Sequence, residues 1–180
     1  MPTAAIGERL AQLFDHDLRS CPLVVDPLLV AGSGDRLAQD DVHAVYLRRL
    51  LPRATVVTPN LGEALRLTGA PDAALAAQAL LGGGCGAVLV TDVQPGGSLI
   101  VNELHRVGQP VERYEMERFR GDYHGTGCTL ASALACGLAE PCPLPVAVTQ
   151  AQRFAHAAVA QAWRPGSRQH IPRRHSRLRG

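Results

Sequence analysis

Three short apolar runs constrain the fold of this chain more than any other feature. They are Leu23-Val24-Val25, residues 54–58 (ATVVT) and residues 86–91 (GAVLVT), and segments with helical apolar spacing stand between them. Runs that are apolar at almost every position are typical of parallel strands buried on both faces. Strands that alternate with helices predict an α/β fold, in which helices cover both faces of a mostly parallel sheet to give three α/β/α layers.

Apolar spacing and breaker residues predict the remaining elements. Helices are expected at residues 4–16, 40–51, 61–68, 72–81, from the glycine-rich segment near residue 125 to about 139, and at about 146–163. Residues 98–103 and 106–118 alternate partially, which predicts antiparallel strands at a sheet edge. Residues 28–38 are expected to form a glycine-containing loop. The run Gly82-Gly83-Gly84 predicts a helix-to-strand turn, because no Gly-Lys-Ser/Thr follows it as in a phosphate loop.

Composition limits the class of protein. The chain has 180 residues, of which 46% are hydrophobic and only 4% aromatic, so we expect one domain with a core of Ala, Leu and Val. A net charge of +2 favours neither a nucleic-acid platform nor a membrane surface. Five cysteines without a Cys-x-x-Cys pair predict reduced thiols in the cytoplasm. No apolar run has the length of a membrane span or signal peptide. Arginines concentrate in residues 164–180, a predicted partly solvated tail for which anion binding is the alternative.

The segment His124-Gly125-Thr126-Gly127-Cys128 opens a long apolar helix. The first N–H groups of a helix have no intrahelical acceptor and the helix dipole adds positive charge, so this segment predicts an anion site. In that field we expect Cys128 to have a lowered pKa and thiolate character. The alternatives are an ordinary helix start in which Cys128 is a small buried side chain, and a nucleophile pair of Cys128 with His124.

Polar residues follow each of the three predicted strands. Asp26 ends the first strand, Asn60-x-x-Glu63 follows the second, and Thr91 follows the third. Carboxyl ends of parallel strands meet at one edge of a sheet, so we expect these side chains to converge there. Asn60 and Glu63 fit both a helix capping box and a pair of oxygen ligands for Mg²⁺, and the two interpretations are compatible. Asp26 fits either the start of a turn or a group that positions metal-bound water or a substrate hydroxyl.

In this order, the motifs resemble the hydroxymethylpyrimidine/phosphomethylpyrimidine kinase family of thiamine biosynthesis, a ribokinase-like family. The resemblance covers residues from about 4 to about 163. It rests on Val24-Val25-Asp26-Pro27, Ser33-Gly34-Asp35, Leu50-Leu51-Pro52, Thr58-Pro59-Asn60-x-x-Glu63, Cys85-Gly86-Ala87-Val88-Leu89-Val90 and His124-Gly125-Thr126-Gly127-Cys128-Thr129-Leu130. It implies phosphorylation of 4-amino-5-hydroxymethyl-2-methylpyrimidine and its monophosphate with ATP and Mg²⁺. A homodimer is the assembly that it implies, with no nucleic-acid or membrane partner.

The resemblance also implies roles for the site residues. Gly125, Thr126, Gly127 and Cys128 match the turn that stabilises charge on the transferred phosphoryl group, and Cys128 matches the residue that deprotonates the accepting hydroxyl. Asn60, Glu63 and Asp26 match the positions that organise Mg²⁺ and the nucleotide phosphates. Thr91 matches a position expected to contact the nucleotide. Many relatives carry Lys-Gly-Gly there, directly after the strand that ends in this chain at Val90.

The chain departs from the family before Asp26, where no Asp-x-x-Gly-Gly-Ala-Gly segment occurs. We therefore expect residues 1–163 to be the C-terminal portion of the kinase domain, with about a third of that domain absent and a strand edge exposed. Three alternatives stay open at this point: a pyridoxal kinase-like enzyme, a non-catalytic nucleotide-binding remnant, and a cysteine-dependent hydrolase or acyltransferase built on Cys128.

Overall fold

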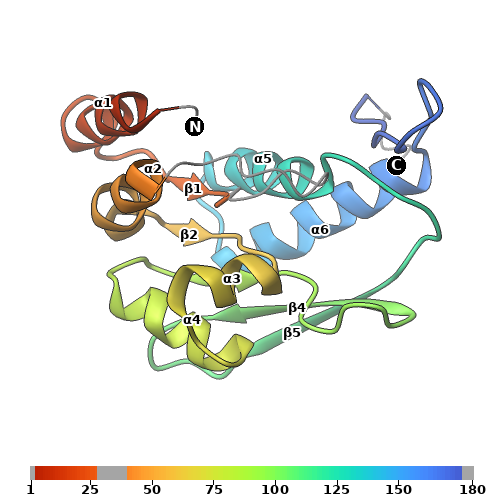
Figure 1. The fold of residues 1–180 in the computed structure, drawn as a ribbon, viewed down its shortest axis with the longest axis horizontal. Helices are drawn as coiled ribbons and strands as arrows, with labels where there is room; N and C mark the ends of the chain where they lie inside the picture. The colour runs from red at the N-terminus through yellow and green to blue at the C-terminus, as the bar shows by residue number, and fades with distance from the viewer. Residues whose placement is uncertain (1–2, 28–39, 176–180) are drawn as a thin grey trace.

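A computed structural model describes residues 3–27 and 40–175 of the chain (Figure 1). The predicted loop at residues 28–38, with Ser33, Gly34 and Asp35, lies outside them. In chain order the elements are α1 (Ala4–Asp15), β1 (Val24–Val25), α2 (Asp40–Val45), a π-helical turn η1 (Tyr46–Leu50), a 3-10 turn η2 (Leu51–Arg53), β2 (Val56–Val57), α3 (Leu61–Thr68), α4 (Ala73–Gly82), β3 (Val88–Val90), β4 (Leu99–His105), β5 (Glu112–Glu117), α5 (Thr126–Leu138) and α6 (Leu144–Ala160). Within these residues, no helix is long and apolar enough to cross a membrane.

The strands form one sheet in the order β1-β2-β3-β4-β5. The first three strands are parallel, and β4 and β5 add an antiparallel hairpin at one edge. This arrangement confirms the predicted parallel strands and the predicted antiparallel pair. At the other edge, β1 pairs only with β2 among the described strands, as expected for an exposed strand edge.

Side chains on the two faces of the sheet enter two separate cores. Val57, Val88 and Val90 pack with residues of α1, η1, α3 and α4. Val56 and Leu89 point the other way and pack with α5 and α6, because successive strand residues face opposite sides. Figure 1 shows the resulting three layers, with α3 and α4 in front of the sheet and α5 and α6 behind it. The cores consist mainly of Ala, Leu and Val, as composition predicted.

Several element boundaries differ from those expected. The helix predicted at 40–51 changes at Tyr46 into the π-helical and 3-10 turns, and Pro52, which has no N–H to donate, lies in the latter. The strand predicted at 106–118 shrinks to β5, because Gly108 at φ +69° forms a turn before it. The last helix begins at Leu144 and ends at Ala160, three residues before the predicted end.

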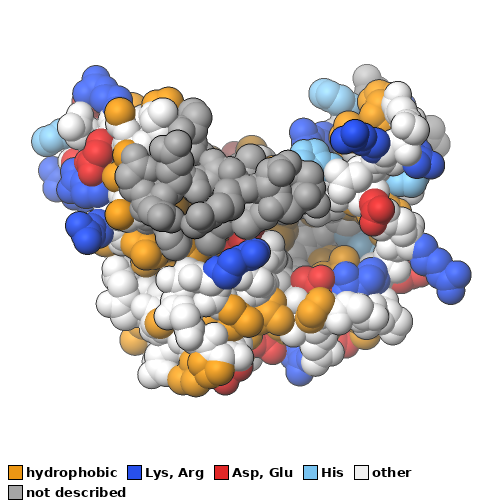
Figure 2. Space-filling view, viewed as in Figure 1, with side chains coloured by type: hydrophobic (Ala, Val, Ile, Leu, Met, Phe, Trp, Pro, Cys, Tyr) orange, Lys and Arg blue, Asp and Glu red, His pale blue; other side chains and the backbone are white. Residues whose placement is uncertain are grey.

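Residues 163–175, called here the C-terminal segment, fold back on the loop before α5. A parallel bridge joins Tyr123 to His170, and the His124 N–H donates to the His170 carbonyl oxygen over 2.9 Å. The Arg173 N–H donates over 2.9 Å to the carbonyl oxygen of Ala158 in α6. Figure 2 shows arginine and histidine side chains gathered over this segment at the upper right. The predicted tail is thus solvent-exposed and also anchored, while the division of the chain at residue 163 stays a prediction.

Candidate phosphate-binding site

The glycine-rich segment forms a tight turn into α5. Gly125 is the N-cap at φ +82°, a conformation that only glycine adopts without steric cost. The first helical hydrogen bond runs from the Thr129 N–H to the Gly125 carbonyl oxygen over 3.0 Å. The N–H groups of Thr126, Gly127 and Cys128 therefore have no intrahelical acceptor. The predicted helix start is confirmed, and binding of an anion to these N–H groups stays a prediction.

The carbonyl oxygen of Gly125 accepts hydrogen bonds from three donors. It accepts from the Thr129 hydroxyl at 2.6 Å and from Arg174 Nη2 at 3.4 Å, in addition to the Thr129 N–H. Arg174 Nε also donates to the Thr129 hydroxyl oxygen at 3.0 Å. In a trans peptide the C=O and N–H point in opposite directions, so holding the Gly125 carbonyl also orients the Thr126 N–H. Sequence reasoning missed Arg174, because nothing in the sequence shows that a residue so distant along the chain returns to this turn.

Asp26, at the end of β1, lies against the same turn. A Cβ built on Gly127 would stand 3.8 Å from Asp26 Oδ2, which is buried and has no hydrogen-bond partner in the described part of the chain. Burial raises the pKa of Asp26, and the Cys128 thiol partly offsets that effect. Burial, and then the charge of Asp26, raise the pKa of Cys128, while the charge of Arg174 opposes them. The expectation of a lowered Cys128 pKa is therefore wrong, because burial and a neighbouring carboxylate outweigh the field of the helix.

Asn60 and Glu63 form the predicted capping box at the start of α3. The Glu63 N–H donates to Asn60 Oδ1, and the Asn60 N–H donates to Glu63 Oε2, each over 2.9 Å. The Glu63 side chain is drawn inward by this contact, and the residue is only 4% exposed. Burial raises the pKa of Glu63 to about 7, and the charge of Asp26 adds to the increase. The carboxyl groups of Asp26 and Glu63 therefore lie close enough to repel each other, as convergence at one sheet edge requires.

Tyr46 is a further polar group near this pair. Its side chain is 6% exposed, and its hydroxyl is buried with no hydrogen-bond partner among residues 3–27 and 40–175. Burial and the charges of Asp26 and Glu63 raise the pKa of Tyr46. The sequence predicted Tyr46 only as an apolar position of a helix. Its place in a π-helical turn, a feature frequent at functional sites, is a property of the folded structure.

Thr91 lies beside Asn60 at the end of β3. The two residues form a parallel bridge that continues the β2–β3 pairing. The Thr91 N–H donates to the Pro59 carbonyl oxygen over 2.8 Å, and the Leu61 N–H donates to the Thr91 carbonyl oxygen over 3.0 Å. The strand end predicted to face the nucleotide is thus placed next to the capping box, while a contact of Thr91 with a nucleotide stays a prediction.

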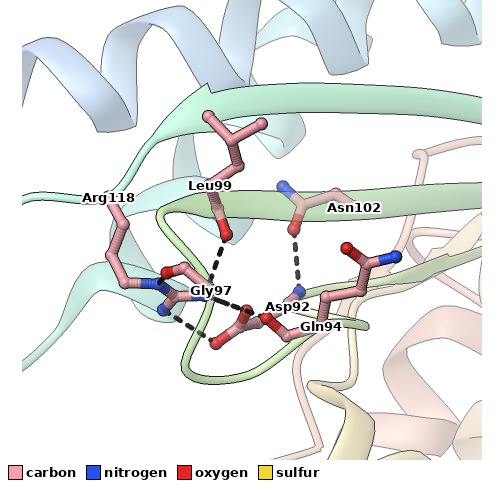
Figure 3. A network of polar contacts seen from close by, with 6 residues as sticks. All are labelled: Asp92, Gln94, Gly97, Leu99, Asn102 and Arg118. Carbon is pink, nitrogen blue, oxygen red and sulfur yellow. Dashed lines mark hydrogen bonds and ion pairs between the residues drawn. The ribbon is translucent and has the colours of Figure 1, made fainter.

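An arginine clamp holds the loop that follows Thr91 (Figure 3). Arg118 donates to both carboxylate oxygens of Asp92, at 2.5 and 3.1 Å, and also to carbonyl oxygens at Gly97 and Leu99. Asp92 has φ +53°, and its own N–H donates to Asn102 Oδ1 over 2.9 Å. Such a bidentate pair fixes geometry as well as adding energy. The sequence carries no signal for this pairing, because the partners lie on separate elements.

The magnesium ligand set predicted from the sequence can be compared with this geometry. No group of three or more His, Cys, Asp and Glu side chains that could hold a metal occurs in the described part of the chain. Two facing acids suffice for Mg²⁺, which commonly keeps several waters and binds through one or two carboxylates plus phosphates. The orphaned Asp26 Oδ2 and the repulsion between Asp26 and Glu63 fit a cation between them. Asn60 fits less directly, because its side-chain oxygen already accepts the capping bond.

A separate cavity of about 440 Å³ opens between α3 and the β4–β5 hairpin. Its lining includes Leu61, Leu65, Gln94, Glu103 and Arg113. None of the residues predicted for the anion turn or the magnesium pair lines it. The candidate site is therefore defined by the α5 turn and the strand ends, and this cavity stands outside it.

A three-layer α/β fold with acids at the ends of parallel strands and a glycine turn opening a helix is the arrangement of the ribokinase-like fold class. Comparison with known proteins agrees with this fold class and identifies one family within it. The chain belongs to the phosphomethylpyrimidine kinase family, whose sequence model matches residues 1–173.

A curated relative agrees with this membership, and solved structures agree with the fold. A hydroxymethylpyrimidine/phosphomethylpyrimidine kinase of Rhizobium meliloti is 44% identical over 150 residues, covering 77% of this chain. The ADP complex of Bacillus subtilis pyridoxal kinase has a TM-score of 0.86 at 25% identity and covers 97% of this chain and 67% of that one. Phosphomethylpyrimidine kinase from Clostridium difficile, with a TM-score of 0.73 at 24% identity, covers 88% of this chain and 66% of that one and supports the fold alone.

The chain spans only part of its curated relatives. The match covers 54% of the Rhizobium meliloti kinase and 60% of the relative from Streptomyces coelicolor. The activity and substrates of the whole relatives are therefore not transferred to this chain without a test.

Proposed function

We propose that this chain is the phosphate-binding part of a kinase that transfers the γ-phosphoryl group of ATP to 4-amino-5-hydroxymethyl-2-methylpyrimidine and to its monophosphate. The observation that carries the proposal is that Asp26 lies against the Gly125–Cys128 turn and also interacts with the charge of Glu63, in a member of the phosphomethylpyrimidine kinase family. These groups come from three separate elements, and they are the groups that a charged phosphoryl transfer needs.

The α5 turn is suited to hold the transferred group. The N–H groups of Thr126, Gly127 and Cys128 are oriented by the helix and have no intrahelical acceptor, which leaves them available to phosphoryl oxygens. Phosphoryl transfer demands mainly positioning and charge stabilisation from the protein, and preorganised N–H groups provide both. The donors that hold the Gly125 carbonyl keep the first of these N–H groups in place.

Asp26 and Glu63 are the residues that would hold Mg²⁺. When bound, this ion supplies positive charge that offsets the two carboxylates and the phosphates of the nucleotide. Asp26 Oδ2 is the group best suited to the role, because it is buried and accepts no hydrogen bond from the residues that the structure describes. Glu63 would contribute through an oxygen or a water, since Oε2 accepts the Asn60 N–H.

Cys128 is the proposed proton acceptor for the substrate hydroxyl. Only its thiolate can accept a proton, and the raised pKa of Cys128 disfavours that form while Asp26 is charged and uncompensated. A thiolate with a raised pKa is also a stronger base once formed. We therefore expect the base to become competent when cations at the site offset the charge of Asp26, which couples proton removal to assembly of the complex.

The proposal is tested by phosphorylation assays with ATP and Mg²⁺. The pyrimidine and its monophosphate are the substrates, and the proteins are the 180-residue chain and a chimera that joins it to the N-terminal part of the Rhizobium meliloti kinase. We expect the chimera to phosphorylate both substrates and its Cys128→Ala variant to lose most of this activity. A folded, ATP-binding chimera that leaves the pyrimidine unchanged would show that the substrate assignment is wrong.

Pyridoxal phosphorylation is the second candidate function, favoured by the TM-score of 0.86 to a pyridoxal kinase. The same assay with pyridoxal distinguishes the two, and faster turnover of pyridoxal than of the pyrimidine would reverse the assignment. Nucleotide binding without turnover by any of the proteins would support a non-catalytic role. A covalent adduct on Cys128 with electrophilic acyl substrates, seen by mass spectrometry, would support the cysteine-dependent alternative.

A further inference from the structure

The positive charge at the α5 turn comes from a residue outside the motifs described above. The sequence contains no lysine, so every one of its 18 Lys and Arg residues is an arginine. Several described arginines already pair with carboxylates: Arg49, Arg53, Arg106, Arg113 and Arg118. Arg174 differs from them, because it forms no ion pair with a described carboxylate and lies instead on the Gly125–Thr129 turn.

The position of Arg174 is set by contacts of the residues that precede it. The neighbouring Arg173 N–H is anchored to α6, and the C-terminal segment is bridged to the loop before α5. The guanidinium lies so close to the turn that a Cβ added to Gly125 would stand 2.7 Å from Arg174 Nη2. Glycine at position 125 is therefore needed twice, for its positive φ and for the approach of this arginine.

The hydrogen bonds of Arg174 leave part of its donor capacity unused. A guanidinium carries five N–H groups. One N–H on Nε is given to the Thr129 hydroxyl and one on Nη2 to the Gly125 carbonyl oxygen. The remaining N–H groups, including both on Nη1, have no acceptor among residues 3–27 and 40–175, and the side chain is solvent-exposed.

The positive charge of Arg174 at the start of α5 favours binding of an anion there. The N-terminal end of a helix is already its positive end, so an unpaired cation placed there is unfavourable without a negative partner. Among the described residues, the nearby carboxyl group of Asp26 forms no ion pair with Arg174. A phosphoryl group would accept both from the free guanidinium N–H groups and from the N–H groups that open α5.

We propose that Arg174 is a phosphate-binding residue of this site, which contacts a phosphoryl group bound at the start of α5. The inference rests on the proposed function for the nature of the anion, and it adds a group from the C-terminal segment that no motif of the chain includes. Arginine is suited to the task, because its planar fork donates two hydrogen bonds to phosphate oxygens and stays charged at all working pH values.

The test uses the full chain and the reactivity of Cys128, which lies on the same turn. The rate of iodoacetamide addition to the Cys128 peptide is measured by mass spectrometry, with exposed Cys21 as internal reference. Sodium tripolyphosphate is the probe, at ionic strength kept constant with NaCl. We expect the probe to protect Cys128 in the wild-type protein, and Arg174→Ala to require about tenfold more probe for the same protection.

Arg173→Ala is the matched control, because the Arg173 backbone N–H that anchors the segment is kept. It should leave protection unchanged, and Arg174→Lys should restore only part of it. Circular dichroism spectra and urea midpoints of the variants establish that each one is folded.

The outcomes separate this inference from the proposed function. Absence of protection in the wild-type protein, or equal protection in Arg174→Ala, overturns the role of Arg174, even if the chimera phosphorylates the pyrimidine. Protection that depends on Arg174 supports the role, even if no phosphorylation of the pyrimidine is found, in which case the site binds a phosphate of another reaction.

Discussion

The buried carboxyl group of Glu63 gives a direct test of the strand-end site. Burial and the charge of Asp26 raise the pKa of Glu63 from its usual value of 4.5 to about 7, so the folded protein favours the protonated form. The free energy of unfolding then falls as the pH rises from about 4.5 to about 7, because the ionised form is better accommodated in the unfolded chain. The difference between the two pKa values corresponds to about 3 kcal/mol.

Glu63→Gln removes the titration and keeps the capping geometry, because the amide oxygen can still accept the Asn60 N–H. The variant should match the wild-type protein at pH 4.5 and exceed its stability by about 3 kcal/mol at pH 8. Urea unfolding followed by circular dichroism measures both values, and Glu140→Gln serves as an exposed control.

A stability difference between Glu63→Gln and the wild-type protein that is the same at both pH values would refute the reasoning. The effect of Mg²⁺ on the urea midpoint is a second test of the charge on Glu63. At pH 8 it should raise the urea midpoint of the wild-type protein more than that of Glu63→Gln, because the ion would offset the repulsion between Glu63 and Asp26. An equal effect of Mg²⁺ on the two proteins would count against the pair as its ligands.

Three further substitutions test the turn and the packing behind it. Asp26→Asn should lower the pKa of Cys128 and speed its alkylation at pH 8 several-fold, and an unchanged or slower rate would contradict the charge coupling described here. Gly125→Ala should cost about 1–2 kcal/mol of stability through its positive φ, and crowding of Arg174 should increase that loss; urea unfolding that shows no loss would show that the turn geometry is wrong. Leu134→Ala empties a fully buried position of α5 and should cost about 3 kcal/mol, whereas a loss below about 1 kcal/mol would contradict the core behind the turn.

Local sequence patterns predicted much of this protein. The apolar runs around Val25, Val57 and Leu89 gave three buried parallel strands, because a strand covered on both faces must be apolar at successive positions. Asn60 and Glu63 gave the capping box at the start of α3, since both partners of that contact lie within one helical turn. The start of α5 at Gly125 was predictable for a similar reason, because the capping conformation depends on the local φ of that residue.

Contacts between distant segments were not predictable in this way. The pKa of Cys128 was expected to fall, because the sequence shows the helix that follows it and not the carboxyl group of Asp26 beside it. The burial of Tyr46 next to two acids follows from the packing of η1 against the strand ends. The clamp between Arg118 and Asp92 likewise joins residues on separate elements.

The sequence by itself determined the order of strands and helices, the helix start at Gly125 and the family to which the chain belongs, because these depend on periodicity and on motifs of a few residues. Only the tertiary structure decided the charge around that turn. It brought Asp26 against Cys128, set Glu63 near Asp26 and returned Arg174 to the first turn of α5. Electrostatic effects depend on distance and burial in space, and neither is written in the spacing of residues along the chain.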